Sequence, residues 1–263
     1  MKVITAVFNW LAERLRDLSM WPINLVRDFP VRVTRLARTV WGGIGGIITF
    51  LPSLVRAAAG GNLGDWFPGR VGRFFNWFHL FLTQIFDLCG GPELGEFVLH
   101  FFARTTPLTS AEIAMISGVL GEDALRFGDV RVVEGGLFDW IFKMNGNLAF
   151  ATWHSINLPR TGGHTRKNLP IVVHELTHVF QYENVGSRYL GEAIYMLIKT
   201  KRDCYNYGGG TGLQDACAVG KCYCDFNREQ QAKITQDFYD LTTQGKDVTA
   251  YEPFITQVRA REI

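Results

Sequence analysis

The sequence predicts an α+β protein in which a helical region, residues 1–105, precedes a mixed domain, residues 106–263. Three observations support this class. Apolar residues recur at helical spacing through the first hundred residues, two segments at 129–133 and 148–156 are rich in β-branched and aromatic residues, and capped helical patterns surround them. Hydrophobic residues make up 47% of the chain and charged residues 20%, which is typical of a folded protein. We therefore expect a small, mostly antiparallel sheet packed against helices.

The N-terminal region combines apolar, aromatic and basic residues. Met1–Leu18 has the pattern of an amphipathic helix, and it lacks the continuous apolar core and the cleavage site of a signal peptide. The apolar run Val40–Val55 is shorter than the roughly 20 residues that a spanning helix needs, and glycines interrupt it. Between Met1 and Phe78 there are ten Lys and Arg against four Asp and Glu, which favours an anionic surface as partner.

The mixed domain begins with clear local signals. Thr109 and Glu112 form a capping-box pattern that starts a helix, and Gly121 ends it. A short strand is expected over Asp129–Val133. A turn at Asn145 and Gly146 then leads into a predicted strand over Leu148–Ile156.

The most informative motif is His174-Glu175-x-x-His178. Asn168 as N-cap and Pro170 in the first turn predict a helix here, and a helix places residues i and i+4 on the same side. His174 and His178 would then bind one zinc ion, and Glu175 could act as general base. The alternative is a core helix whose histidines are only hydrogen-bonded.

A catalytic zinc site usually takes a third protein ligand. No histidine follows His178, so we expect an acidic ligand from a later helix. Glu192 lies in a predicted helix over Ser187–Thr200, and Glu229 lies in the first turn of a helix that Asn227 caps. The residues alone leave both glutamates open as the third ligand.

Two motifs together give a resemblance. His-Glu-Leu-Thr-His-Val-x-Gln, followed some fifty residues later by Asn-x-Glu-Gln-Gln-Ala, resembles the small zincin-like proteins associated with Vgr and Rhs secretion components. It is similar, more distantly, to zincin-like domains of contractile injection systems. The resemblance covers roughly residues 107–243. It implies a gluzincin-type metallopeptidase with His174, His178 and Glu229 as ligands of one zinc ion and Glu175 as base.

Two further groups of residues bear on the site. Tyr195, Tyr205 and Tyr207 are possible oxyanion donors, and no spacing rule selects one of them. The chain has five cysteines, one of which lies apart from the others. The other four are Cys204, Cys217, Cys222 and Cys224. They predict two disulfides, and hence an oxidising compartment. The alternative is that they bind a second, structural zinc ion.

The expected function is zinc-dependent hydrolysis of a peptide or protein substrate, with a secretion-system carrier protein as a further partner. One alternative is a non-catalytic binding or loading module of a secretion assembly. Another is a membrane-interacting protein that works through residues 1–105, by peripheral contact with the bilayer. The plainer interpretation of that region is a helical subdomain packed on the rest. We expect a bacterial protein, exported by a specialised route or peripheral to a membrane, and we expect no nucleic-acid partner.

Overall fold

The computed structural model describes residues 2–101, 103, 105–135 and 139–263, and it is an α+β protein. The chain forms two compact units. One unit comprises Met1–Arg14 together with Glu96–Ile263, and the other comprises Leu15–Gly95. The first holds the sheet and the histidine motif, and the second is wholly helical.

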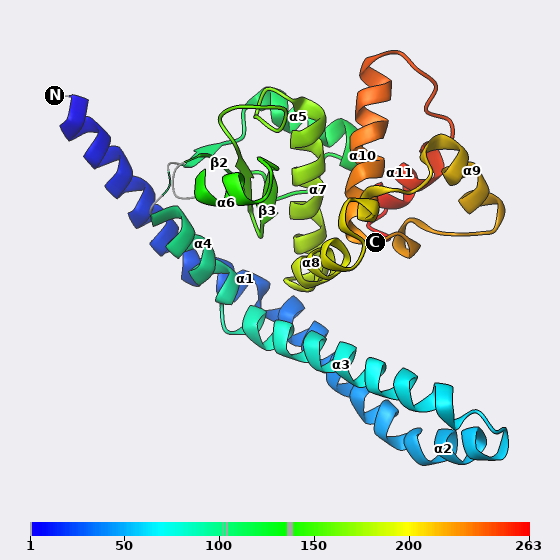
Figure 1. The fold of residues 1–263 in the computed structure, drawn as a ribbon. Coiled ribbons are helices and arrows are strands. Elements are labelled where there is room, and N and C mark those ends of the chain that lie inside the picture. The colour runs from blue at the N-terminus through cyan, green and yellow to red at the C-terminus, as the bar shows by residue number, and fades with distance from the viewer. Residues whose placement is uncertain (1, 102, 104, 136–138) are drawn as a thin grey trace. The chain divides into compact units, whose positions relative to one another are not determined.

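The Leu15–Gly95 unit is a helical hairpin (Figure 1). Its helices are α1 (Lys2–Ile48, of which the first residues belong to the other unit), α2 (Phe50–Ala59) and α3 (Leu63–Leu88). Helix α1 continues through Pro22 and Pro30 and so extends far beyond the helix expected over Met1–Leu18. Trp77 Nε1 donates to the main-chain oxygen of Thr39 at 2.7 Å, which joins α3 to α1. Among the described residues no single helix meets the length and hydropathy needed to cross a bilayer, although α1 from Trp10 and α2, bent by 43°, meet them as a pair.

A four-stranded mixed sheet forms one layer of the other unit, with the strand order β1-β2-β4-β3. The β1–β2 and β3–β4 pairs are antiparallel, and β2–β4 is parallel. The strands are β1 (Thr105–Pro107), β2 (Arg131–Glu134), β3 (Phe150–Thr152) and β4 (Ser155–Leu158).

The single strand expected over Leu148–Ile156 is therefore wrong, because the chain reverses within it. Trp153 has a φ of +40°, and its main-chain N–H donates to the Tyr189 hydroxyl instead of to a strand. The two halves become the antiparallel neighbours β3 and β4. Alternation of residue types does not reveal such a tight reversal.

Helices cover the sheet and build the core. Helix α7 packs against both the sheet and α10, so it runs between them (Figure 1). Its inward residues, among them Val172, Leu176, Val179 and Phe180, are fully buried. The helices of this part are α4 (Gly91–Phe101, of which the residues before Glu96 belong to the other unit), α5 (Ser110–Leu120), α6 (Asp139–Met144), α7 (Leu169–Val185), α8 (Arg188–Thr200), α9 (Gly209–Ala218), α10 (Arg228–Thr243) and α11 (Glu252–Arg259), with 3-10 turns η2 (Lys201–Tyr205) and η3 (Tyr223–Asp225).

The predicted helix starts are confirmed with one exception. Thr109 and Glu112 form a complete capping box at α5, and Asn227 forms one at α10. Pro170 stands in the first turn of α7 as expected. Asn168 precedes that helix but its side chain makes no capping hydrogen bond, because its amide donates to the carbonyl of Gly163 instead.

Candidate metal centre

The histidine motif on α7 faces the first turn of α10. His174 Nε2 and His178 Nε2 each lie 3.3 Å from Oε2 of Glu229. All three residues are buried, and their ligand atoms lie within 4.8 Å of one another. Helical spacing brings the two histidines to one side of α7, and the Asn227 capping box sets Glu229 in the first turn of α10. The structure thus brings together three side chains from two helices, and two of these residues, His174 and Glu229, are 55 positions apart in the sequence.

These distances can be compared with those around a metal ion. A tetrahedral ion with bonds of about 2.0–2.1 Å separates its ligand atoms by about 3.3–3.4 Å. Both His-to-Glu229 separations match this value. Both edges that meet at the carboxylate oxygen therefore fit a tetrahedral ion, and the two imidazole nitrogens lie within 4.8 Å of each other. Three such ligands would leave one tetrahedral corner for another ligand.

Gln181 fixes the tautomer of His178. Its Nε2 lies 3.0 Å from the main-chain oxygen of Arg228 and 3.0 Å from Oε1 of Gln231. A main-chain carbonyl can only accept, so the amide nitrogen faces Arg228 and Oε1 faces His178 Nδ1, at 2.8 Å. His178 Nδ1 therefore donates to Gln181, so in the neutral imidazole Nε2 is the nitrogen whose lone pair can bind a metal ion.

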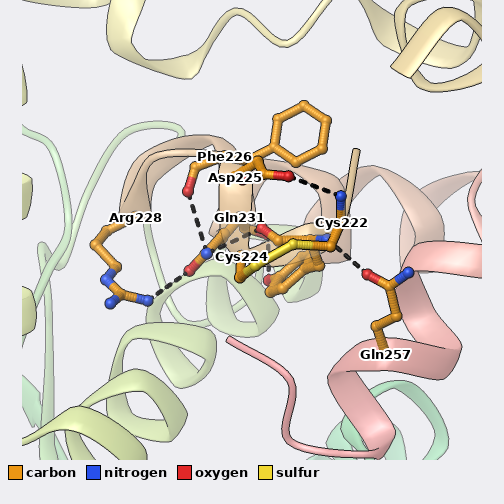
Figure 2. Close-up of a disulfide and its surroundings, with 8 residues drawn as sticks. Cys222, Cys224, Asp225, Phe226, Arg228, Gln231 and Gln257 are labelled. Atoms are coloured by element: carbon orange, nitrogen blue, oxygen red, sulfur yellow. Dashed lines mark hydrogen bonds between the residues drawn. A yellow bond between two sulfur atoms is a disulfide. The ribbon is translucent and has the colours of Figure 1, made fainter. Parts of the chain in front are cut away.

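Gln231 holds Gln181 in this orientation. Its Nε2 donates to the main-chain oxygens of Tyr223 and Phe226, each at 3.1 Å. The Oε1 atom of Gln231 is therefore turned toward Gln181 and Arg228. It accepts from Nε2 of Gln181 and from Nη1 of Arg228, each at 3.0 Å. Figure 2 shows Gln231 between Phe226 and Arg228. Main-chain carbonyls thus orient two successive amides and, through them, His178.

Glu175 lies one residue after the first histidine and is 4% exposed. Its Oε2 is buried and has no hydrogen-bond partner among the described residues. Burial raises the pKa of Glu175 to about 8, with the charge of His178 opposing the shift and that of Glu229 adding to it. A metal cation held by the three ligands would oppose this shift as well. A metal cation at this site would therefore lower the pKa of Glu175 and favour its ionised form.

The three ligand side chains shift one another's pKa values, because a carboxylate lies beside two imidazoles. Burial raises the pKa of Glu229, but the charges and hydrogen bonds of His178 and His174 outweigh burial and lower it. Burial lowers the pKa of His174. For His178, the charge and hydrogen bond of Glu229 outweigh burial and raise the pKa to about 9. Glu229 therefore stays ionised, as a metal ligand must.

Glu192, the alternative third ligand, pairs with two arginines and not with the histidines. Its Oε1 lies 2.5 Å from Nε of Arg188, and its Oε2 accepts from Nε of Arg228 at 2.8 Å. Glu192 is not a member of the clustered group of possible metal ligands. It therefore supports the start of α10 through Arg228, while Glu229 faces the histidines.

The three candidate tyrosines differ in position. The ring centroid of Tyr205 lies 5.9 Å from that of His174. The Tyr207 hydroxyl instead donates to Asp237 at 2.6 Å, and Tyr195 is 59% exposed. Among the three, Tyr205 is the one placed beside a ligand histidine.

The clustered cysteines form one disulfide, Cys222–Cys224, instead of the two expected (Figure 2). Cys217 is an exposed thiol, and Cys204 is a buried one. Burial and the charge of Glu229 raise the pKa of Cys204 to about 11, so this thiol stays protonated. Although Cys222, Cys224 and Asp225 lie within metal-ligand distance of each other, the disulfide occupies both sulfurs.

Sequence reasoning gave no role to Gln181, Gln231 or Arg228. The signal for Gln181 is its position three residues after His178, which places both on one side of α7. The other two lie on α10, so only the packing of the two helices reveals their part.

Comparison with known proteins adds no relative. No protein-family model matches the chain, and no curated protein or solved structure matches it significantly.

Proposed function

We propose that this protein is a zinc-dependent hydrolase that cleaves peptide bonds, with His174, His178 and Glu229 as ligands and Glu175 as general base. The observation that carries the proposal is the placement of Glu229 Oε2 at 3.3 Å from Nε2 of each histidine. Two imidazoles and one carboxylate are a common ligand set of catalytic zinc, which leaves a fourth position open. The resemblance of both motifs to zincin-like proteins of secretion assemblies supports the same reaction and a role as an exported effector.

The chain's own residues would divide the work as follows. A bound zinc ion would polarise the scissile carbonyl and lower the pKa of a water molecule. Glu175 Oε2, which lacks a hydrogen-bond partner among the described side chains, would take the proton of that water and pass it to the leaving amine. Tyr205, beside His174, would donate a hydrogen bond to the developing oxyanion.

One observation favours a second candidate. The exposed fractions of the three ligands and Glu175 are between 4% and 8%, and a site with so little solvent access admits a peptide substrate poorly. A binding or loading module that retains zinc without catalysis would have such a site. The unpartnered Glu175 oxygen favours the catalytic reading, because a structural site gains nothing from a buried carboxylate without a partner.

Metal analysis and peptide cleavage separate these possibilities. We expect about one zinc per chain by mass spectrometry in the wild type. Zinc should be lost in His174→Ala and Glu229→Ala and retained in Glu192→Ala, the matched glutamate. Glu175→Gln should retain zinc but lose cleavage of a peptide library by at least about a hundredfold.

Four results would contradict parts of the proposal. A wild type without zinc, even after zinc is added back, would refute the metal site. Zinc binding that survives Glu229→Ala would refute the third ligand. Equal turnover by the wild type and Glu175→Gln would refute Glu175 as the general base. No turnover by either would refute catalysis and leave the binding module.

A further inference from the structure

The helical hairpin of the Leu15–Gly95 unit has one side made entirely of apolar residues. On α1, the positions turned toward the rest of the hairpin are half-buried or buried and follow helical spacing: Leu25, Asp28, Arg32, Arg35, Thr39, Gly43 and Gly46. On α3, the corresponding half-buried or buried positions are Trp66, Arg70, Trp77, Leu80, Gln84 and Asp87. Buried Arg32 reaches Glu93 and the Asp87 carbonyl, and Trp77 reaches Thr39, so these positions form the contact between the antiparallel helices.

The residues that come directly after the contact positions form the apolar side of the hairpin. One residue along an α-helix is a rotation of about 100°, and in two antiparallel helices this rotation points to the same side of the pair. We call this side the apolar flank. On α1 it consists of Val26, Phe29, Val33, Leu36, Val40, Ile44 and Ile47, and on α3 of Phe67, Val71, Phe78, Phe81, Ile85 and Leu88.

Most of this flank is open to solvent. Exposed fractions reach 77% at Ile47 and 65% at Phe67, and most of the remaining side chains are more than a third exposed. Large apolar surfaces of this kind mark an interaction site.

The opposite flank, one residue before each contact position, is mostly polar or glycine. On α1 it consists of Asn24, Arg27, Val31, Thr34, Arg38, Gly42 and Gly45, and on α3 of Asp65, Gly69, Asn76, His79, Thr83 and Phe86. The two flanks of the hairpin therefore differ in polarity, and further exposed apolar residues, among them Trp41 and Phe75, lie outside both flanks. Such an element can lie in a membrane interface with one side in the acyl region and the other in water.

The net positive charge of the hairpin favours an anionic bilayer over a second copy of the hairpin as its partner. Over the whole Leu15–Gly95 unit, eight arginines outnumber five carboxylates, which are Asp17, Asp28, Asp65, Asp87 and Glu93. Like charges oppose a second copy of the hairpin on the same flank, whereas anionic lipid headgroups attract each arginine near the surface. We propose that the apolar flank binds an anionic bilayer, with the hairpin lying along the interface.

The experiment is co-sedimentation of the full chain with vesicles. The probes are phosphatidylcholine vesicles and vesicles that also contain phosphatidylserine. We expect binding to the anionic vesicles, weaker binding to the neutral ones, and loss of binding as salt screens the arginines.

Paired variants test the two flanks. Ile44→Gln with Phe78→Gln on the apolar flank should lower the partition coefficient at least about tenfold, because both side chains leave the acyl region. Thr34→Gln with Asn76→Gln, exposed positions on the opposite flank, should leave it unchanged. Far-ultraviolet circular dichroism and metal content should match the wild type in both, so that a loss of binding is not a loss of folding.

Several results would overturn the proposal. They are absence of binding to both vesicle types, equal binding to neutral and anionic vesicles, or equal effects of the two paired variants. A dimer in light scattering that Ile44→Gln with Phe78→Gln converts to a monomer, without vesicle binding in the wild type, would identify a second copy as the occupant. None of these readouts depends on catalysis.

Discussion

Gln181 determines which nitrogen of His178 can bind a metal ion. Its amide nitrogen is held by the Arg228 carbonyl, so its oxygen must accept from His178 Nδ1. We expect Gln181→Leu to lower zinc affinity about 10- to 100-fold, as the loss of an outer-shell partner usually does. Competition with a chromophoric chelator measures this effect.

Thr177→Val is the matched control for Gln181→Leu. Thr177 is fully buried on the same helix, and its hydroxyl bonds to the Val173 carbonyl and to the Thr235 hydroxyl instead of to a ligand side chain. The valine variant should lose stability but keep its zinc affinity within about twofold. Equal losses of affinity in the two variants would mean that any buried polar contact of α7 has the same effect, and the specific role of Gln181 would be refuted.

Glu112 provides a pH-dependent contribution to stability. Burial raises its pKa, but two hydrogen bonds from Arg166, each 2.7 Å, and those from Thr109 outweigh burial and lower it. A carboxyl whose pKa is lowered by folding stabilises above its unfolded pKa of about 4.3 and loses that contribution as the pH falls below it. Glu112→Gln should therefore cost about 1–3 kcal/mol at pH 7 and progressively less in acid, as urea denaturation can measure.

Glu134→Gln tests whether burial matters in that cluster. Glu134 also pairs with Arg166, at 3.7 Å, but its side chain is 44% exposed. Exposed ion pairs contribute about 0–1 kcal/mol, so this variant should change stability little at any pH. A pH dependence of Glu112→Gln that matched the wild type would show that the carboxyl does not titrate with folding.

At the scale of elements, the start of α10 places the third ligand. Asn227 Oδ1 accepts from the N–H of Gln230 at 2.9 Å, and its amide donates to the Cys204 carbonyl at 3.0 Å. Asn227→Ala should cost about 1 kcal/mol and weaken zinc binding, because Glu229 lies in the turn that the cap orders. Calorimetry and chelator competition measure the two effects.

Asn227→Asp separates the two bonds of this cap. Aspartate keeps the acceptor for Gln230 but loses the donor to Cys204, so it should recover most of the stability lost in alanine. Zinc affinity restored together with stability would assign the effect to the cap. An alanine variant with unchanged affinity would show that Glu229 is held by its contacts to the histidines alone.

Local signals predicted much of this fold. The capping boxes at Thr109 and Asn227, the helix over the histidine motif and the helix Ser187–Thr200 depend on residues a few positions apart, and the structure confirms them. The reversal at Trp153 was not predictable in this way, because it depends on a hydroxyl of α8 thirty-six residues away.

The candidate site shows the same division between local and long-range information. Helical spacing alone predicted that His174 and His178 share one side of α7. It could not choose between Glu192 and Glu229, because that choice depends on Arg188 and Arg228 pairing with Glu192. The orientation of Gln181 likewise requires the packed α10.

At the scale of the whole molecule, a metal ion would cross-link α7 and α10, which supply its ligands from positions 55 residues apart. Zinc at a free concentration about a hundred times its dissociation constant would stabilise the fold by about 2.7 kcal/mol. For 150–250 residues each kcal/mol shifts the melting temperature by about 2–4 °C, so chelation should lower it by about 5–10 °C. Differential scanning calorimetry with and without a chelator measures this shift.

The matched variants decide what such a shift means. His174→Ala should melt at the temperature of the chelated wild type and should not respond to the chelator, because it has no complete site to empty. Glu192→Ala should respond as the wild type does, since Glu192 pairs with arginines instead of the ligand group. A chelator effect that persists in His174→Ala would place the stabilising metal elsewhere in the chain. The connection between the histidine motif and the stability of the whole unit would then fail, even if some metal were bound.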